Sequence, residues 1–370
     1  MIRLQTPLPE KYKAASESEL ASIISRAKKT LGRRVLILGH HYQRDEVMQW
    51  ADARGDSFGL SKIAARTTDA EFIIFCGVHF MAESADILTS ASQKVILPDL
   101  NAGCSMADMA DIYEVEEAWE RISDVVDVSD VIPITYINSS AALKAFVGRN
   151  GGSVCTSTNA KSVLTWALGL DGNQARGSKV LFFPDQHLGR NTAVQLGFSE
   201  ADMALWNPKL ESGGLEDVQI KESRFLLWKG HCSVHQRFSP AHIADFRNRF
   251  PSGQVIVHPE CSLDVVRLAD ATGSTDSIIS FVRDAPSGSQ IAIGTEIHLV
   301  NRLAKEFPEL YIECLDPLIC PCSTMFRIDS AHLAWVLENL AESRVVNQIV
   351  VDSDVAEWAG VALSRMLEII

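Results

Sequence analysis

Basic residues are scarce in this sequence, and they form no cluster. Its 370 residues include 34 Lys and Arg against 47 Asp and Glu, which gives a formal net charge of −13. Proteins that bind nucleic acid usually gather Lys and Arg on one face. We therefore expect no nucleic-acid partner. Small anionic substrates stay compatible with this charge, because helix N-termini and histidines attract anions locally.

Long hydrophobic runs are also absent. No stretch approaches the ~18 consecutive apolar residues that span a bilayer, and residues 1–20 lack the apolar core of a secretory signal. Hydrophobic residues make up 46% of the chain and the mean hydropathy is +0.05, as in ordinary globular proteins. We expect no membrane partner, a cytoplasmic location, and enough buried core for two or three domains.

Eight cysteines stand at positions 76, 104, 155, 232, 261, 314, 320 and 322. In a reducing compartment they are not expected to form a disulfide framework. Free cysteines are often buried apolar residues. The useful question is which of them bind a metal.

Continuous apolar runs indicate strands that are buried on both faces. Amphipathic helical patterns separate these runs, and this alternation predicts parallel three-layer α/β/α domains. The expected strands are Val35–His40, Phe72–Gly77, Lys94–Asp99, Ile132–Asn138, Lys179–Asp185, Arg224–Gly230, Gln254–Glu260, Gln290–Glu296 and Leu310–Asp316.

The nine runs form three sets with one plan. In each set a polar pair ends the first strand, a Ser or Thr opens the next helix, and a cysteine follows the third strand. The three sets are His40 and Tyr42, Ser57, Cys104; Tyr136 and Asn138, Ser157, Cys232; and His258 and Glu260, Thr275, Cys322.

The spacing supports an internal triplication. From the first histidine, 17 residues lead to the hydroxyl residue and 64 to the cysteine, in both the first and the third set. The middle set is longer, with 21 and 96 residues from Tyr136. Most of the surplus is a polar stretch at 196–220, which we interpret as an insertion. We therefore expect three pseudo-symmetric repeats at 1–105, 106–238 and 239–370, the last closed by helices over 328–340 and 355–370.

In open parallel sheets, ligands bind beyond the carboxyl ends of the strands. Three repeats that share a centre would bring three cysteines together there. Three thiolates suit a [4Fe-4S] cluster whose fourth iron is open and can act as a Lewis acid. A short helix is expected after each cysteine, at 105–110, 233–238 and 323–327, and would favour the thiolate.

Two alternatives for these cysteines stay open. A zinc site could use Cys232 and His235 with the Cys320-Pro-Cys322 pair, although the single-residue spacer is short for zinc. Cys320 could also replace Cys322 as the cluster ligand. The 64-residue period favours Cys322.

The remaining residues of each set have two possible roles. Ser57, Ser157 and Thr275 are either anion binders at helix starts or ordinary N-caps. The histidines and Glu260 suit acid–base chemistry, because histidine titrates near neutrality and burial tunes a carboxyl. The acid–base and orienting candidates are His40, Tyr42, Tyr136, Asn138, His235, His258 and Glu260.

At this point the sequence resembles the quinolinate synthase family along nearly its whole length. The resemblance rests on an ordered set of motifs: GHHYQRDEV, ADARGDSFGLSKIA, FCGVHFMAESADIL, LPDLNAGCSMADM, TYINSSAALKA, VCTSTNA, FPDQHLGRN, GHCSVHQRF, VHPECSLDVV, TGSTDSII, IAIGTEIHLVNRL and CPCSTMFRI.

The resemblance implies three α/β domains around one [4Fe-4S] cluster, bound by Cys104, Cys232 and Cys322. It implies that iminoaspartate, supplied by L-aspartate oxidase, condenses with dihydroxyacetone phosphate to give quinolinate, phosphate and water in NAD biosynthesis. The implied active-site positions are His40, Tyr42, Ser57, Tyr136, Asn138, Ser157, His235, His258, Glu260 and Thr275.

One motif departs from the family pattern. Many relatives have Pro-Asp-Lys-His where this chain has Pro-Asp-Gln-His at 184–187. If that lysine attracts phosphate, His187 or Arg190 has to supply the charge here. The mechanism we expect uses Glu260 and Tyr42 as proton carriers, with His235 and His258 as further candidates.

Two other function classes compete with this interpretation. A phosphosugar aldolase or isomerase without a cluster would use zinc or no metal. An iron–sulfur redox sensor would have no use for the hydroxyl and histidine residues. Iron and sulfide analysis separates the three classes.

Overall fold

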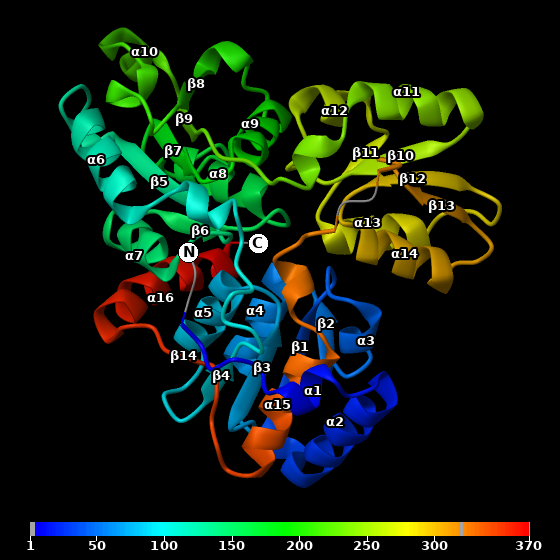
Figure 1. Cartoon of the computed structure of the whole chain (residues 1–370). Helices are drawn as coiled ribbons and strands as arrows, with labels where there is room; N and C mark the ends of the chain where they lie inside the picture. Colours follow the sequence, from blue (N-terminus) through cyan, green and yellow to red (C-terminus); the bar gives the residue numbers. More distant parts are fainter. Residues whose placement is uncertain (1–3, 319–320, 370) are drawn as a thin grey trace. The chain divides into compact units, whose positions relative to one another are not determined.

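A computed structural model describes residues 4–318 and 321–369 of the chain (Figure 1). The chain forms two compact units, which we call the first and the second unit. The first unit consists of Met1–Cys104 and Pro321–Asp352, and the second of Ser105–Cys320 and Ser353–Ile370. One sheet lies in the first unit and two lie in the second.

The sheet of the first unit has the strand order β14-β4-β3-β1-β2. All its pairings are parallel except that of β14 with β4. Its strands are β1 (Val35–His40), β2 (Ala53–Gly55), β3 (Phe72–Cys76), β4 (Lys94–Ile96) and β14 (Gln348–Ile349).

The two sheets of the second unit are parallel throughout. One has the order β6-β5-β7-β9-β8 and the other β11-β10-β12-β13. The first of them contains β5 (Val131–Tyr136), β6 (Ser153–Cys155), β7 (Lys179–Phe183), β8 (Met203–Trp206) and β9 (Phe225–Trp228). The second contains β10 (Gln254–Val257), β11 (Ala271–Thr272), β12 (Gln290–Gly294) and β13 (Tyr311–Cys314).

The three sheets share one strand order, in which a short edge strand pairs with the first long strand and two further strands follow on its other side. All nine predicted runs overlap one of these strands, and the predicted parallel α/β fold is confirmed. The sequence patterns missed β2, β6, β8, β11 and β14, which have two to four residues each and lie at or near sheet edges. One of these, β8, lies inside the predicted insertion and extends the edge of its sheet.

Helices connect the strands, as parallel pairing requires. Among the described residues, no helix is long and apolar enough to cross a bilayer. The first unit contains α1 (Glu10–Lys13), α2 (Glu17–Leu31), α3 (Asp45–Met48), α4 (Ser57–Arg66), α5 (His79–Leu88) and α15 (Ser330–Ala341). The second contains α6 (Ile112–Ser123), α7 (Ala141–Arg149), α8 (Ala160–Leu168), α9 (Gln186–Gln195), α10 (Asp217–Glu222), α11 (Pro240–Arg249), α12 (Leu263–Leu268), α13 (Thr275–Arg283), α14 (Ile297–Glu306) and α16 (Ser353–Glu368).

The C-terminal segments do not close the third repeat, so that expectation is wrong. Helix α15 packs against α2, and β14 pairs with β4 in the first unit. Helix α16 packs against α7 and β6 in the second unit. The helices at 328–340 and 355–370 exist much as predicted, but their packing partners lie far back along the chain. The repeat limits at 105/106 and 238/239 stay a prediction.

A bond between an aspartate carboxylate and a strand N–H repeats in the first and third sheets. The Asp52 carboxylate accepts the N–H of Ile37 on β1 at 2.9 Å, and the Asp270 carboxylate accepts the N–H of Val255 on β10 at 2.7 Å. Each Asp lies 15 residues after its partner. These equal local bonds agree with the predicted internal repeat.

Candidate active site

The polar pairs after β1 and β10 adopt the same turn. The N–H of Tyr42 is bonded to His40 Nδ1 at 3.2 Å, and the N–H of Glu260 is bonded to His258 Nδ1 at 3.4 Å. The carbonyl of each histidine also accepts the N–H three residues on. Both histidines are buried. The H-x-Y and H-x-E patterns therefore form one structural motif at two strand ends.

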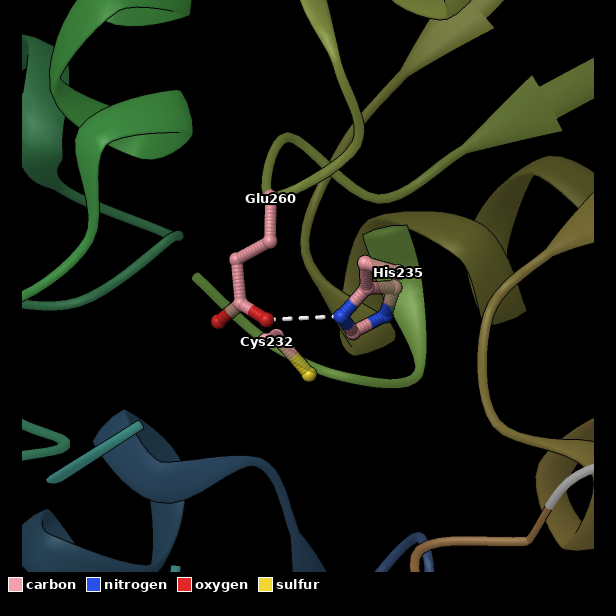
Figure 2. A group of neighbouring side chains, drawn as sticks. All are labelled: Cys232, His235 and Glu260. Carbon is pink, nitrogen blue, oxygen red and sulfur yellow. Dashed lines mark hydrogen bonds and ion pairs between the residues drawn. The ribbon is translucent and has the colours of Figure 1, made fainter. Parts of the chain in front are cut away.

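A buried acid–base cluster lies in the second unit. Glu260 accepts a hydrogen bond from His235 Nδ1 at 2.6 Å (Figure 2). Its carboxylate also bonds the Tyr136 hydroxyl. The rings of His235 and His258 stack with centroids 4.4 Å apart. Thr295 Oγ1 lies 3.1 Å from His235 Nε2. The structure thus brings together Tyr136, His235, His258 and Glu260, all of which the sequence had selected.

The charge state of this cluster follows from its contacts. Burial alone would raise the pKa of the Glu260 carboxyl, but the charges of His235 and His258 and the hydrogen bonds from His235 and Tyr136 lower the pKa to about 2. Burial lowers the pKa of His258 to about 3. At neutral pH Glu260 is therefore an ionised acceptor, and His258 is a neutral imidazole.

Asp185 is a second buried carboxyl near Glu260. Burial and the Glu260 charge raise its pKa well above the usual value, although backbone N–H groups of Leu188, His187 and Cys232 oppose this shift. Active sites often raise the pKa of one carboxyl and lower that of another, so that the first can serve as an acid. The Asp185 contact with Cys232 also ties β7 to the loop that carries the cysteine.

Cys232, His235 and Glu260 form a group in which one ligand atom from each lies within 4.8 Å of the others (Figure 2). Such a set could hold a single metal ion. However, His235 directs Nδ1 toward Glu260 and Nε2 toward Thr295. A single ion would have to displace one of these bonds. Cys320, the further zinc candidate, lies outside the described residues.

The three predicted cluster ligands occupy equivalent loops. Each thiol is partly exposed, and each cysteine precedes by three residues a 3-10 helix of one turn. The expectation of longer helices there is wrong, and one turn contributes little dipole to the thiolate. The three turns are Ala107–Met109, His235–Arg237 and Met325–Arg327.

The four other described cysteines have raised thiol pKa values; Cys76, Cys155 and Cys261 are fully buried, and Cys314 is partly exposed. Burial raises the pKa of the Cys76 thiol to about 12, that of Cys314 to about 11, and those of Cys155 and Cys261 further above the usual value. Such thiols are poor metal ligands, because the thiolate is the binding form. Packing explains all four.

The hydroxyl residues are not N-caps. Asp56 caps α4 through the N–H of Gly59 at 2.7 Å, and Ser274 caps α13, so Ser57 and Thr275 occupy the first helical position. Ser157 lies in a turn before α8 and does not open that helix, which corrects the expectation. It lines a cavity of about 510 Å³ with Gly273 and Ser274.

Asn138 follows β5, two residues after Tyr136. Its side-chain oxygen is buried and has no hydrogen-bond partner among the described residues. Buried polar atoms are normally paired, and an exception at a strand end suits a ligand-binding role. His40, Tyr42, Ser57, Cys104 and Cys322 lie in the first unit, so the meeting of all three cysteines at one centre stays a prediction.

Comparison with known proteins decides the family. A family model described as quinolinate synthetase A protein matches residues 22–368. The quinolinate synthase of Corynebacterium glutamicum is 54% identical over 366 residues, which cover 99% of this chain and 91% of that protein. The chain belongs to the quinolinate synthase family. Proteins of the same name from Acidobacterium capsulatum (53% over 361 residues, 97% and 95% covered) and Rhodopirellula baltica (51% over 369 residues, 97% and 93% covered) are also similar.

Membership of the quinolinate synthase family confirms the resemblance that the motifs had indicated. Sequence reasoning overlooked Thr295 and gave Asp185 no role, although both contact the site through His235 or Cys232. A single Thr or Asp at a strand end gives no distinctive pattern. The position equivalent to the usual lysine, Gln186, is the first residue of α9, and the next residue, His187, bonds Gln236 at 2.8 Å.

Proposed function

We propose that this chain is a quinolinate synthase that condenses iminoaspartate with dihydroxyacetone phosphate to give quinolinate, phosphate and water. Family membership across the chain supports the activity. The observation that carries the chemistry is the buried Glu260 carboxylate, bonded to His235 and Tyr136 beside Cys232. This set can move protons in a site shielded from water.

The cofactor we propose is one [4Fe-4S] cluster held by Cys104, Cys232 and Cys322. These thiols are partly exposed, whereas Cys76, Cys155 and Cys261 are fully buried. Three thiolates from these residues would hold the cluster and leave one iron open, and that iron would supply Lewis acidity for the loss of hydroxide from the substrate.

The protein's own residues bind and orient the substrates and move protons. Glu260 and Tyr42 carry protons, with His235 and His258 as further acid–base groups. Neutral His258 can accept a proton, and ionised Glu260 accepts hydrogen bonds from His235 and Tyr136 and so orients both groups. The groups that hold carboxylates and phosphate so that the reacting carbons stay close are His40, Ser57, Asn138, Ser157 and Thr275.

The Glu260→Gln variant tests the proton-transfer role. We expect a loss of turnover of at least ~100-fold, in line with general acid–base catalysis, with an unchanged cluster spectrum near ~400 nm, typical of a thiolate-bound cubane. Glu313→Gln is the control, because Glu313 is a partly buried carboxylate that bonds Arg249 and Tyr311. Activity close to that of the parent in Glu260→Gln would refute the role.

One observation favours a second candidate, an aldolase with a single metal ion. Cys232, His235 and Glu260 are close enough to hold such an ion. Anaerobic purification followed by iron, zinc and sulfide analysis decides between the two. About four irons and four sulfides per chain support the cluster; one zinc and no acid-labile sulfide would support the alternative.

Functional coupling to L-aspartate oxidase is part of the proposal, because iminoaspartate hydrolyses in water and has to be supplied nearby. A cytoplasmic location agrees with this supply. Mixing the two enzymes with L-aspartate and dihydroxyacetone phosphate should yield quinolinate.

A further inference from the structure

The residue five positions after each proposed cluster cysteine contacts a segment that lies far away in the sequence. In every case this residue ends the 3-10 turn that follows the cysteine. Each contact reaches the segment that leads to the next cysteine in the cycle. The three residues are Met109 after Cys104, Arg237 after Cys232 and Arg327 after Cys322.

Two of these contacts are ion pairs with buried aspartates. In the second unit, Arg237 Nε and Nη2 lie 2.9 and 2.8 Å from Asp316 Oδ2. In the first unit, Arg327 Nε lies 2.8 Å from Asp99 Oδ2. The aspartate side chains are 6% and 1% exposed, whereas the arginines are 38% and 46% exposed. Each arginine therefore neutralises a carboxylate that water cannot solvate.

Both aspartates also shape the loop that leads to a cysteine. Asp316 Oδ1 accepts the N–H of Leu318 at 2.8 Å, and Asp99 Oδ1 accepts the N–H of Asn101 at 2.9 Å. Asp316 lies six residues before Cys322. Asp99 lies five residues before Cys104. The same carboxylate thus bonds its own loop with one oxygen and the arginine of the preceding repeat with the other.

The third contact is made by neutral groups in the second unit. The Trp228 indole N–H donates to the Met109 carbonyl at 2.7 Å, and the His231 N–H lies 3.4 Å from Met109 Sδ. Trp228 ends β9, four residues before Cys232. A buried indole and a methionine here replace the ion pair found in the other two contacts.

We propose that Arg237 and Arg327 are positioning residues that, with Met109, tie the three cysteine loops head to tail in a ring. This inference rests on the proposed cluster. Each cysteine loop would then be held by the residue that follows the previous cysteine. Loss of one arginine contact would loosen the next cysteine, which the arginine itself does not contact. Groups around metal ligands fix their geometry, and their loss typically weakens metal binding by ~10–100-fold.

The test measures iron release from the anaerobically purified full chain to a ferrous-iron chelator. Arg237→Gln and Arg327→Gln should each release iron at least ~10-fold faster than the parent, and the lysine variants should partly restore the parental rate. Arg247→Gln is the matched control. Arg247 also bonds an aspartate, Asp270, and a nearby carbonyl, that of Leu268, but Asp270 is 40% exposed.

The control variant should release iron within ~2-fold of the parent, because an exposed ion pair contributes little. Release from Arg237→Gln or Arg327→Gln at the control's rate would overturn the ring. Should either glutamine variant fail to fold, Asp316→Asn and Asp99→Asn remove the same charge pairs while keeping side-chain shape, and the same rates are expected.

A second measurement separates failure of this inference from failure of the proposed function. If the parent binds no iron and sulfide, the cluster proposal fails, but hydrogen exchange of the metal-free chain still tests the contacts. The Leu318 amide should exchange ~10-fold faster in Arg237→Gln than in Arg247→Gln, since opening of its bond to Asp316 becomes easier. Equal exchange rates of the Leu318 amide in the two variants would refute the proposed ring as well.

Discussion

The hydrogen bond from the Tyr136 hydroxyl to Glu260 offers a sharp test of the buried acid–base cluster. Tyr136→Phe removes this donor and changes the buried volume little. A hydrogen bond to a charged group contributes ~1.5–3 kcal/mol, and one pKa unit corresponds to 1.36 kcal/mol. The pKa of Glu260, about 2 in the parent, should therefore rise by ~1–2 units. Glu260 stays ionised at pH 7.

The effect on stability has a defined sign. Because its contacts lower the pKa of Glu260 below the ordinary 4.5, the ionised group contributes stability that is fully present above pH 4.5 and is lost as the pH falls toward 2. Tyr136→Phe should reduce the free energy of unfolding by ~1.5–3 kcal/mol at pH 7. Because the unfolded state is the same in both, the difference from the parent should shrink only as the pH falls below the raised pKa of the variant, ~3–4, toward the parental value of about 2.

Urea unfolding of the metal-free chain between about pH 2 and pH 8 measures this difference. Tyr311→Phe is the control, because Tyr311 donates the same kind of bond to Glu313 at 2.7 Å but is 45% exposed. The control should lose no more than ~0.5 kcal/mol. An equal loss in the two variants, or a difference that does not depend on pH, would show that Tyr136 does not stabilise an ionised Glu260.

Two further predictions concern a side chain that orients a histidine and a close helix contact. Thr295→Val removes the bond to His235 Nε2 without a change of side-chain shape. It should lower kcat by ~10-fold, because groups that position catalytic residues act through geometry. An unchanged kcat at equal iron content would contradict this. Gly148→Ala on α7 should lower the melting temperature, because the added Cβ would lie 2.0 Å from the Trp358 carbonyl oxygen of α16. Without this contact, Ala would stabilise a helix interior by ~1 kcal/mol relative to Gly. A rise in the melting temperature on calorimetry would refute the packing argument.

The strand plan and the repeat could be predicted from the sequence because both are local properties. A strand buried on both faces must be apolar over its whole length, so β1, β5 and β10 are visible as continuous runs. Equal spacing between His40 and Ser57 and between His258 and Thr275 exposed the repeat. The same local chemistry produces the H-x-Y and H-x-E turns, in which the bond spans two residues.

Contacts between distant segments were decided by tertiary structure. Helix α15 packs on α2 and α16 packs on α7, and no sequence period predicts these pairings. An amphipathic pattern shows that one face of a helix is buried, but it does not show which element covers that face. The caps of α4 and α13 fell on Asp56 and Ser274, one residue before the expected hydroxyls, because backbone geometry selects the capping position.

The sequence by itself determined the fold class, the residue types of the site and their order along the chain. It named His235, His258, Tyr136 and Glu260, which the fold brings into contact. Only the tertiary structure decided which of them share a proton, how burial and charge set the pKa of Glu260, and which arginine neutralises Asp316 or Asp99. The reason is physical: residue identity sets what a group can donate or accept, whereas pKa and pairing depend on neighbours that the folded chain brings together.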